Sequence, residues 1–146
     1  MQSLDITPPM IALKHGKRGL MVSTVRRMDD FARGLLAVTA TGPRRGDVVI
    51  DSSLRQFRVA SSKKATGSIL DRLRSIFSPK SIRYDVLFDA PEAISLAEVK
   101  SAVAAALTSS NSVREYWNET TISVDHRLKK VAEAESFSSL CKALRH

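Results

Sequence analysis

Apolar residues recur with two clear periods between residues 81 and 107. Over Ser81–Phe88 they occupy every second position, which predicts a strand with one buried face. Over Leu96–Leu107 they recur at every third or fourth position with alanines beside them, which predicts an amphipathic helix lying close to a sheet. Ser95 and Glu98 have the spacing of a capping box, which places the start of that helix. We expect this strand and helix to form the nucleus of the fold.

Shorter patterns predict further elements on both sides of this unit. Runs of apolar and β-branched residues predict strands at Leu20–Val25, Val48–Ile50, Leu54–Ala60 and Thr120–Val124. Apolar residues at helical spacing predict helices at Met28–Val38, Ser68–Phe77, Val113–Trp117 and Arg127–Glu135, and a last helix from Phe137 to Leu144. This order predicts an α+β fold, with a mainly antiparallel sheet of about five strands covered on one face by three to four helices.

The first residues of the chain are expected to lie outside that sheet. The pair Pro8-Pro9 lacks backbone donors and cannot enter a helix, and the segment His15–Gly19 has the composition of a basic turn. We therefore predict an extended basic N-terminal arm over residues 1–19 and a single α+β domain over residues 20–146.

Length and composition narrow the class of protein. A chain of 146 residues is long enough for one domain that buries roughly two-thirds of its unfolded surface. No apolar run approaches the ~20 residues of a membrane span, and Met1–Asp5 lacks the layout of a secretion signal. The single cysteine, Cys141, cannot form an internal disulfide. We expect a cytoplasmic protein without a transmembrane segment, and leave open a peripheral contact with a membrane.

The charge of the chain is strongly asymmetric. The net charge is +8, yet residues 1–80 hold 15 basic and 6 acidic side chains, whereas residues 81–146 hold 8 basic and 9 acidic ones. A basic half of this kind is typical of a surface that meets nucleic acid, anionic lipid or an acidic protein. The alternative interpretation is a charged surface that only keeps the protein in solution.

Basic residues in the first half are the candidates for anion binding. They lie in the turn near residue 16, at a Gly-Pro turn near residue 44, on the strand with Phe57, and in a hydroxyl-rich loop that leads into the helix Ser68–Phe77. The candidate residues are Lys14, Lys17, Arg18, Arg44, Arg45, Arg58, Lys63, Lys64, Arg72 and Arg74. Only 5% of the residues are aromatic, which favours contact with lipid or with the nucleic-acid backbone over the readout of bases.

Residues with catalytic or metal-binding chemistry do not form a recognisable motif. His15, His126 and His146 are far apart in the sequence, and no nucleotide P-loop, Gly-x-Ser-x-Gly or kinase signature is present. The acids Asp85, Asp89 and Glu92, and the pair Asp125-His126, remain open as sites. We expect no cofactor, no bound metal and no enzymatic activity.

Two short segments match motifs of extracellular proteins. Arg45-Gly46-Asp47 resembles a cell-adhesion tripeptide, and Asn118-Glu119-Thr120 fits a glycosylation acceptor. Both meanings require an extracellular protein, so we interpret the two matches as chance. Cys141 lies on the apolar side of the last predicted helix, which indicates packing.

Three functional hypotheses follow from these observations. The first is a non-enzymatic basic protein that contacts nucleic-acid phosphates, of RNA or DNA, through loops of its N-terminal half. The second is a self-assembling structural protein, of the viral matrix or capsid kind, that forms a homo-oligomer and binds anionic membrane or nucleoprotein. The third is a small enzyme of unrecognised type, whose residues are distant in the sequence.

Overall fold

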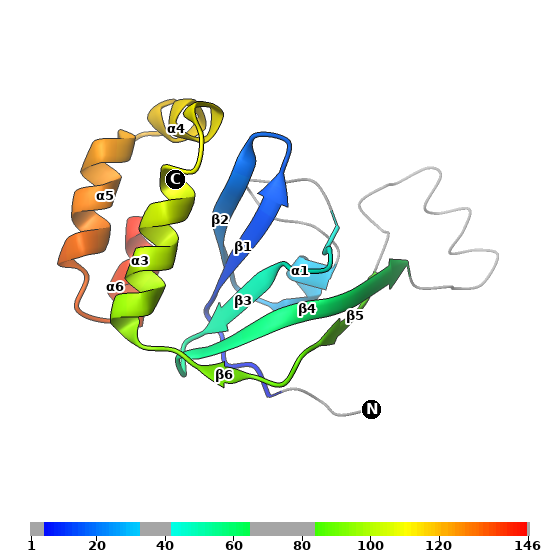
Figure 1. The fold of residues 1–146 in the computed structure, drawn as a ribbon. Helices are drawn as coiled ribbons and strands as arrows, with labels where there is room; N and C mark the ends of the chain where they lie inside the picture. Colours follow the sequence, from blue (N-terminus) through cyan, green and yellow to red (C-terminus); the bar gives the residue numbers. More distant parts are fainter. Residues whose placement is uncertain (1–4, 33–41, 65–83, 146) are drawn as a thin grey trace.

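The structure is a computed structural model that describes residues 5–32, 42–64 and 84–145. Figure 1 shows an antiparallel sheet with most of its helices on one side. The elements in chain order are β1 (Met10–Gly16), β2 (Gly19–Val25), α1 (Met28–Ala32), β3 (Val48–Asp51), β4 (Arg55–Lys64), β5 (Tyr84–Phe88), β6 (Glu92–Ala93), α3 (Leu96–Leu107), α4 (Asn111–Asn118), α5 (Val124–Glu133) and α6 (Phe137–Ala143). The predicted α+β fold with a mainly antiparallel sheet is confirmed.

The strands of the sheet follow the order β2-β1-β3-β4-β5, and these neighbours pair antiparallel. β4 is ten residues long and pairs with two strands along its outer edge. β6 pairs with its first residues, and β5 pairs with its second half. The strands predicted at Val48–Ile50 and Leu54–Ala60 correspond to β3 and β4, which pair antiparallel. The second half of β4 and its partner β5 extend away from α3, α4, α5 and α6 (Figure 1).

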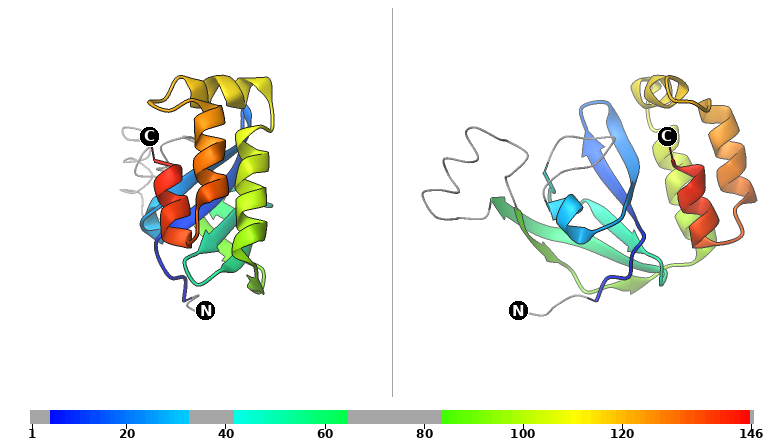
Figure 2. Two further views of the ribbon diagram at one scale, coloured as in Figure 1. Left: turned by 90° about the vertical axis from the view of Figure 1, so that its left-hand side faces the viewer. Right: turned by 180° about the vertical axis from the view of Figure 1, so that it is seen from behind.

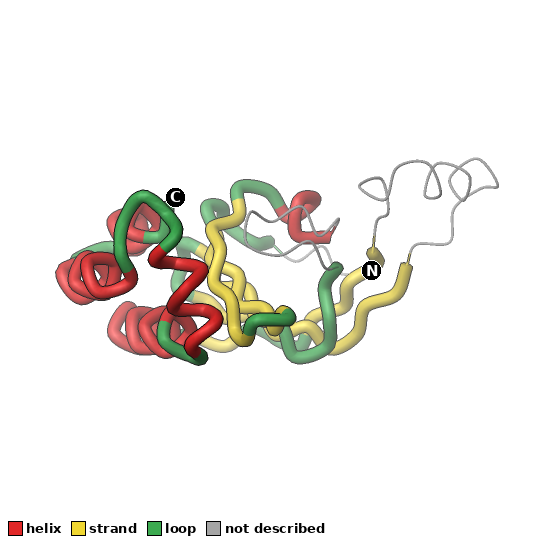
Figure 3. The backbone as a smooth tube through the Cα atoms, turned by 90° about the horizontal axis from the view of Figure 1, so that it is seen from above, coloured by secondary structure: helices red, strands yellow, loops and turns green. Residues whose placement is uncertain are grey.

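Side chains on the two faces of the sheet form two cores. On β1, Ile11 and Leu13 belong to a main core with the helices α3 to α6, while Met10 and Ala12 belong to a second core around Phe31 of α1. Figure 3 shows the helices α3 to α6 on one side of the strands and α1 apart from them. Helices therefore lie on both faces, and the expectation of helices on one face is corrected.

Serine side chains start the four helices of the main layer. Ser95 accepts a hydrogen bond from the backbone N–H of Glu98, whose carboxylate accepts one from the N–H of Ser95, so the predicted capping box is confirmed. Ser110, Ser123 and Ser136 cap α4, α5 and α6 in the same position. Figure 2 shows α3, α5 and α6 side by side, with α4 crossing their upper end.

A buried arginine joins α4, α5 and α6. Arg127 is fully buried, and its guanidinium donates to the carbonyls of Ala143 and Arg145 at 2.8 and 2.7 Å and to the hydroxyl of Thr120 at 2.8 Å. It also lies 4.7 Å from the ring centroid of Trp117. Burial lowers the pKa of Arg127, but a guanidinium starts so high that it keeps its charge. This buried position was not expected, because the sequence pattern placed only apolar residues inward on α5.

Two sequence predictions are corrected by local hydrogen bonds and pairing. Residues 120–123 form a turn between two helices instead of a strand, because the hydroxyl of Thr120 donates to the carbonyl of Trp117 at 2.6 Å and lies 3.1 Å from the carbonyl of Ile122. The N-terminal arm is shorter than predicted, since Met10–Gly16 is β1, which pairs with strands on both sides. The arm was predicted from Pro8-Pro9 and from the basic turn near residue 16. β1 begins directly after Pro9 and runs up to that turn.

Candidate nucleic-acid interface

The predicted anion-binding residues fall into groups with different surroundings. Lys17 and Arg18 lie at the turn between β1 and β2, and Arg44, Arg45, Arg58 and Lys63 lie on or beside β4; all six are exposed. Lys14 is buried. Lys64 ends β4, and its side chain, like Arg72 and Arg74 in the predicted helix Ser68–Phe77, lies outside the described residues. Two exposed candidate surfaces therefore remain among the described residues: the turn between β1 and β2, and the basic residues on or beside β4.

The turn between β1 and β2 is docked on the helical layer. The hydroxyl of Ser110 donates to the carbonyl of Arg18 at 2.6 Å, and the guanidinium of Arg18 lies 5.6 Å from the ring centroid of Tyr116. Gly19 adopts a φ of 138°, and a Cβ there would lie 3.1 Å from the Ser110 hydroxyl. Burial raises the pKa of Tyr116, against the charge of Arg18. Gly19 thus allows the turn to approach Ser110 closely.

A β-bulge decides which way the basic residues of β4 point. The register pairs Val59 with Phe88 before the bulge and Ser62 with Val86 after it. Because Phe88 and Val86 pack against the second core, Val59 and Ser62 face that core too. Arg58 precedes Val59 and Lys63 follows Ser62, so both point to the opposite face of the sheet. In a regular strand, residues five positions apart would point to opposite faces.

The bulge therefore places Arg58 and Lys63 on one exposed face, roughly 15 Å apart along the strand at about 3.3 Å per residue. The partners of this face on β5 are Asp85 and Leu87, which are also exposed. Figure 1 shows this half of the sheet extending away from α3 to α6, so that these helices leave the face uncovered.

The turn that carries Arg44 and Arg45 is attached to the same part of β4. The N–H of Gly46 donates to the carbonyl of Val59 at 2.9 Å, and the N–H of Val59 donates to the carbonyl of Asp47 at 2.8 Å. The backbone of this turn is consequently held against Val59, the residue that follows Arg58. We use the term β4 basic surface for the four exposed residues Arg44, Arg45, Arg58 and Lys63.

Lys14 supports this surface from inside the protein. Its ammonium group lies 3.6 Å from the buried carboxylate of Asp47 and donates to the carbonyl of Gly42 at 2.9 Å. The same carboxylate accepts the N–H of Arg44 at 2.9 Å, which closes the basic turn. Burial lowers the pKa of Lys14, and the charge of Asp47 opposes that shift. Lys14 therefore supports the turn from inside, and its ammonium group is not exposed to a phosphate.

The hydroxyl-rich basic loop predicted to lead into the helix Ser68–Phe77 is corrected in its first part. Ser61–Lys64 continue β4, because Ser61, Ser62, Lys63 and Lys64 all pair with residues of β5. Strand propensity ended at Ala60 in the sequence, and only the pairing with β5 extends the strand. Lys63 is therefore fixed on a sheet instead of lying on a loop.

The two motif matches belong to the folded framework. Asp47 of the Arg45-Gly46-Asp47 match is only 1% exposed and holds the turn from inside, so its carboxylate is not presented to a partner. The Asn118 side chain accepts the N–H of Val124, and the hydroxyl of Thr120 contacts the guanidinium of Arg127. Both sequences thus have internal structural roles.

The described acids and histidines considered as sites are not assembled into a metal centre, and His146 lies outside the described residues. Within the part of the chain that the structure describes, no group of three or more His, Cys, Asp or Glu side chains is placed to hold a metal ion. Asp85, Asp89 and Glu92 are exposed along the edge formed by β5 and β6. Asp125 and His126 are exposed in the first turn of α5, where Ser123 caps the helix.

Cys141 packs inside the helical layer, and burial raises the pKa of its thiol to about 11. Since the thiolate is the reactive form, we expect iodoacetamide to alkylate native Cys141 about a hundredfold more slowly near pH 8 than the same residue in denatured protein. Mass spectrometry of samples quenched over time measures both rates. Equal rates in native and denatured protein would show that the thiol is accessible in the fold.

Comparisons with protein-family models, with curated proteins and with solved structures find no match to this chain. Over residues 5–32, 42–64 and 84–145, no helix is both long enough and apolar enough to cross a membrane. The β4 basic surface is therefore the main basis for proposing a function.

Proposed function

We propose that this protein is a non-enzymatic binding protein that contacts the phosphates of nucleic acid through the β4 basic surface. The observation that carries the proposal is the bulge in β4, which brings Arg58 and Lys63 to one exposed face beside the turn with Arg44 and Arg45. The proposal also places the protein in the cytoplasm, where a free cysteine such as Cys141 stays reduced.

The physical basis is the release of counterions from the nucleic acid. Each cation that meets a phosphate of a duplex contributes about −0.9 to the slope of log affinity against log salt concentration, so four cations give about −3.6. Binding should consequently weaken about 150-fold between 50 and 200 mM salt. Arginine suits this role because its fork of N–H donors fits a phosphate and keeps its charge at every working pH.

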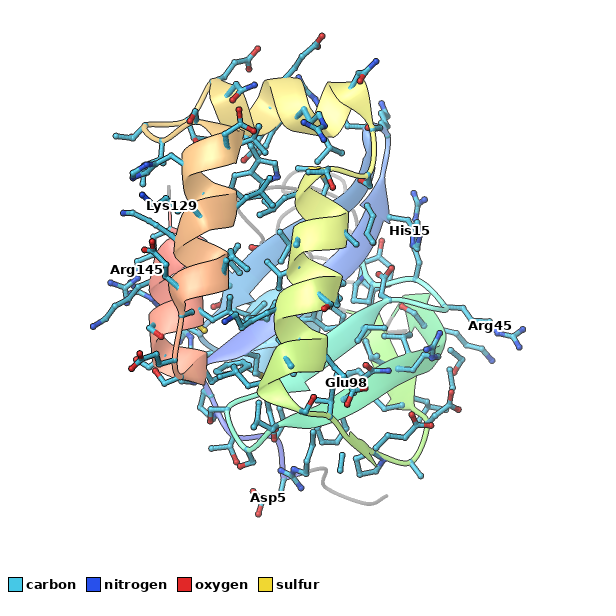
Figure 4. The ribbon with its side chains drawn as sticks, turned by 60° about the vertical axis from the view of Figure 1, so that its left-hand side comes forward. Asp5, His15, Arg45, Glu98, Lys129 and Arg145 are labelled. Atoms are coloured by element: carbon cyan, nitrogen blue, oxygen red, sulfur yellow. The ribbon has the colours of Figure 1, made fainter. Side chains whose placement is uncertain are left out.

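The test compares two matched double variants in a salt series. Arg58→Gln/Lys63→Gln removes one arginine and one lysine from the β4 basic surface, and Lys129→Gln/Arg145→Gln removes the same two residue types from the helical layer. All four residues are exposed, and Figure 4 shows Lys129 and Arg145 on the side of the molecule opposite to Arg45. Fluorescence anisotropy with labelled DNA and RNA measures the affinities.

We expect the first double variant to reduce the slope by about 1.8 and the second to leave it nearly unchanged. Equal effects of the two variants would refute the β4 basic surface, because the binding would then follow net charge alone. Anionic vesicles form a separate arm of the experiment. Binding to vesicles but not to DNA or RNA would reject the nucleic-acid proposal in favour of a membrane-facing protein.

A second candidate function is a self-assembling structural protein, and one observation favours it. Leu87 is 65% exposed on the edge strand β5, next to the β4 basic surface. An exposed leucine on a strand edge can join two copies of a chain. Sedimentation at rising protein concentration tests this candidate: oligomers that Leu87→Ser dissolves would support it, and a monomer at all concentrations would reject it.

A further inference from the structure

We infer that the preferred partner is a double-stranded nucleic acid, recognised by its backbone, instead of a single strand with unstacked bases. This inference rests on the proposed function and makes it more specific. Its basis is the combination of fixed cations on the β4 basic surface with aromatic rings that, among the described residues, are buried or point away from that surface.

Proteins that bind single strands usually stack bases on exposed aromatic rings. In the described part of this chain no ring lies on the face of Arg58 and Lys63. Tyr84 is half-buried, but it lies two residues before Val86 and so points with Val86 towards the second core. Phe57 is 1% exposed and lies edge-on to Phe88, and Phe88 in turn stacks on the buried Phe31. In the helical layer, Tyr116 packs edge-on against the buried Trp117. The aromatic residue nearest to Arg58 in the sequence is therefore buried and unavailable to a base.

Without a ring to stack on, a single strand loses more binding affinity than a duplex does. One base stacked on a ring strengthens binding by about 5- to 150-fold, and a single strand depends on this gain. A duplex keeps its bases stacked inside and offers only phosphates and groove edges. A surface of cations without rings is thus matched to the duplex.

Charge density favours the duplex as well. Each phosphate contact contributes about −0.9 to the salt slope on a duplex and about −0.7 on a single strand, so four contacts differ by about 0.8. If the two affinities are equal at 1 M salt, the duplex binds about sixfold more tightly at 0.1 M salt.

The way the cations are held fits a rigid partner. Arg58 and Lys63 project from a paired strand, and the turn with Arg44 and Arg45 is closed by the carboxylate of Asp47. Cations on such a frame keep their spacing, and a duplex presents phosphates at a fixed spacing too. A flexible single strand would have to be ordered on the surface, which reduces its affinity.

The first experiment is a competition on the full chain between a duplex and its two separated strands, at equal phosphate concentration and about 0.1 M salt. We expect the duplex to bind about sixfold more tightly, for DNA and RNA and for several base compositions. Single strands that bind as tightly as the duplex, or more tightly, would overturn this inference and leave the proposed function standing. No binding to either form would overturn both.

A variant with an added aromatic ring tests whether a missing ring limits single-strand binding. Leu87→Trp adds an aromatic ring to the exposed face beside Ser61, and Ser138→Trp adds the same ring on the exposed side of α6. We expect Leu87→Trp to strengthen single-strand binding by about fivefold or more while duplex binding stays the same, and Ser138→Trp to change neither. An unchanged single-strand affinity of Leu87→Trp would contradict the idea that a missing ring limits this surface.

Discussion

Replacing Asp47 by alanine should lower the free energy of unfolding by about 3–5 kcal/mol, because the variant leaves the buried charge of Lys14 without its carboxylate. Both side chains are 1% exposed, so water cannot replace the lost partner without a change in the fold. The variant also removes the acceptor of the Arg44 N–H and so opens the basic turn. Urea denaturation followed by circular dichroism measures the loss.

A double-mutant cycle separates the ion pair from the packing around it. We expect Lys14→Met/Asp47→Ala to be more stable than Asp47→Ala alone, because the unfavourable buried ammonium group is removed. Exposed Asp89→Ala serves as the control for the loss of a carboxylate and should change stability by less than about 0.5 kcal/mol. Additive effects of the two substitutions in the cycle would show that Lys14 and Asp47 are not coupled.

The pH dependence of Asp47→Ala has a definite sign. Burial lowers the pKa of Lys14 from 10.5, and Asp47 raises it again, so the variant should have a still lower pKa at Lys14. Between that lowered pKa and 10.5, the unfolded chain holds the proton of Lys14 and the folded chain does not, so folding becomes more favourable as the pH rises. The difference in free energy of unfolding between the native sequence and Asp47→Ala should therefore become smaller from neutral pH towards pH 10.5. A constant difference would mean that the charge of Lys14 is not its cause.

Replacing Asp51 by alanine should also cost about 3–5 kcal/mol of stability. The carboxylate is fully buried and accepts four hydrogen bonds, three from the backbone N–H groups of Thr7, Ser53 and Arg55 and one from the Arg55 guanidinium. It therefore fixes the turn between β3 and β4 and holds the chain before β1 against that turn. Each donor left without an acceptor adds to the loss.

The experiment on Asp51 uses an isosteric variant as its internal comparison. Asp51→Asn keeps the shape and one carbonyl acceptor but loses the charge that pairs with Arg55 at 2.8 Å, so we expect it to fall between the native sequence and Asp51→Ala. Hydrogen exchange of the Ser53 and Arg55 amides reports on the turn itself. Unchanged protection of both amides in Asp51→Ala would contradict the role given to this carboxylate.

These interior charges bear on the function proposed for the surface. Arg44 and Arg45 can act as a defined pair only while the turn is closed, and its closure depends on Asp47 and Lys14. Asp47 and Lys14 therefore contribute both to the stability of the fold and to the position of Arg44 and Arg45. Substitutions at Asp47 are for this reason tests of stability, and the exposed cations are the proper tests of binding.

Local signals in the sequence were sufficient for much of the fold. The alternation in Ser81–Phe88 predicted β5, and Ser95 with Glu98 predicted the start of α3, because a period of two and a capping box depend only on neighbouring residues. The strands β3 and β4 and the helix α4 were also predicted. The excess of basic residues in the first half followed from composition alone.

Contacts between distant residues determined the remaining features. β1 was missed because its position inside the sheet depends on pairing with β2 and β3. The buried Lys14 and Arg127 resemble solvent-exposed residues in the sequence, and only the carboxylate of Asp47 and the carbonyls at the end of α6 allow them to be buried.

The β4 basic surface has the same origin. Counting residues along β4 places Arg58 and Lys63 on opposite faces, and only the bulge formed by pairing with β5 brings them together. The sequence thus determined which charges the protein carries and most of its helices and strands. The pairing of strands determined which of those charges share a face, because the direction of a side chain on a sheet depends on its partner strand.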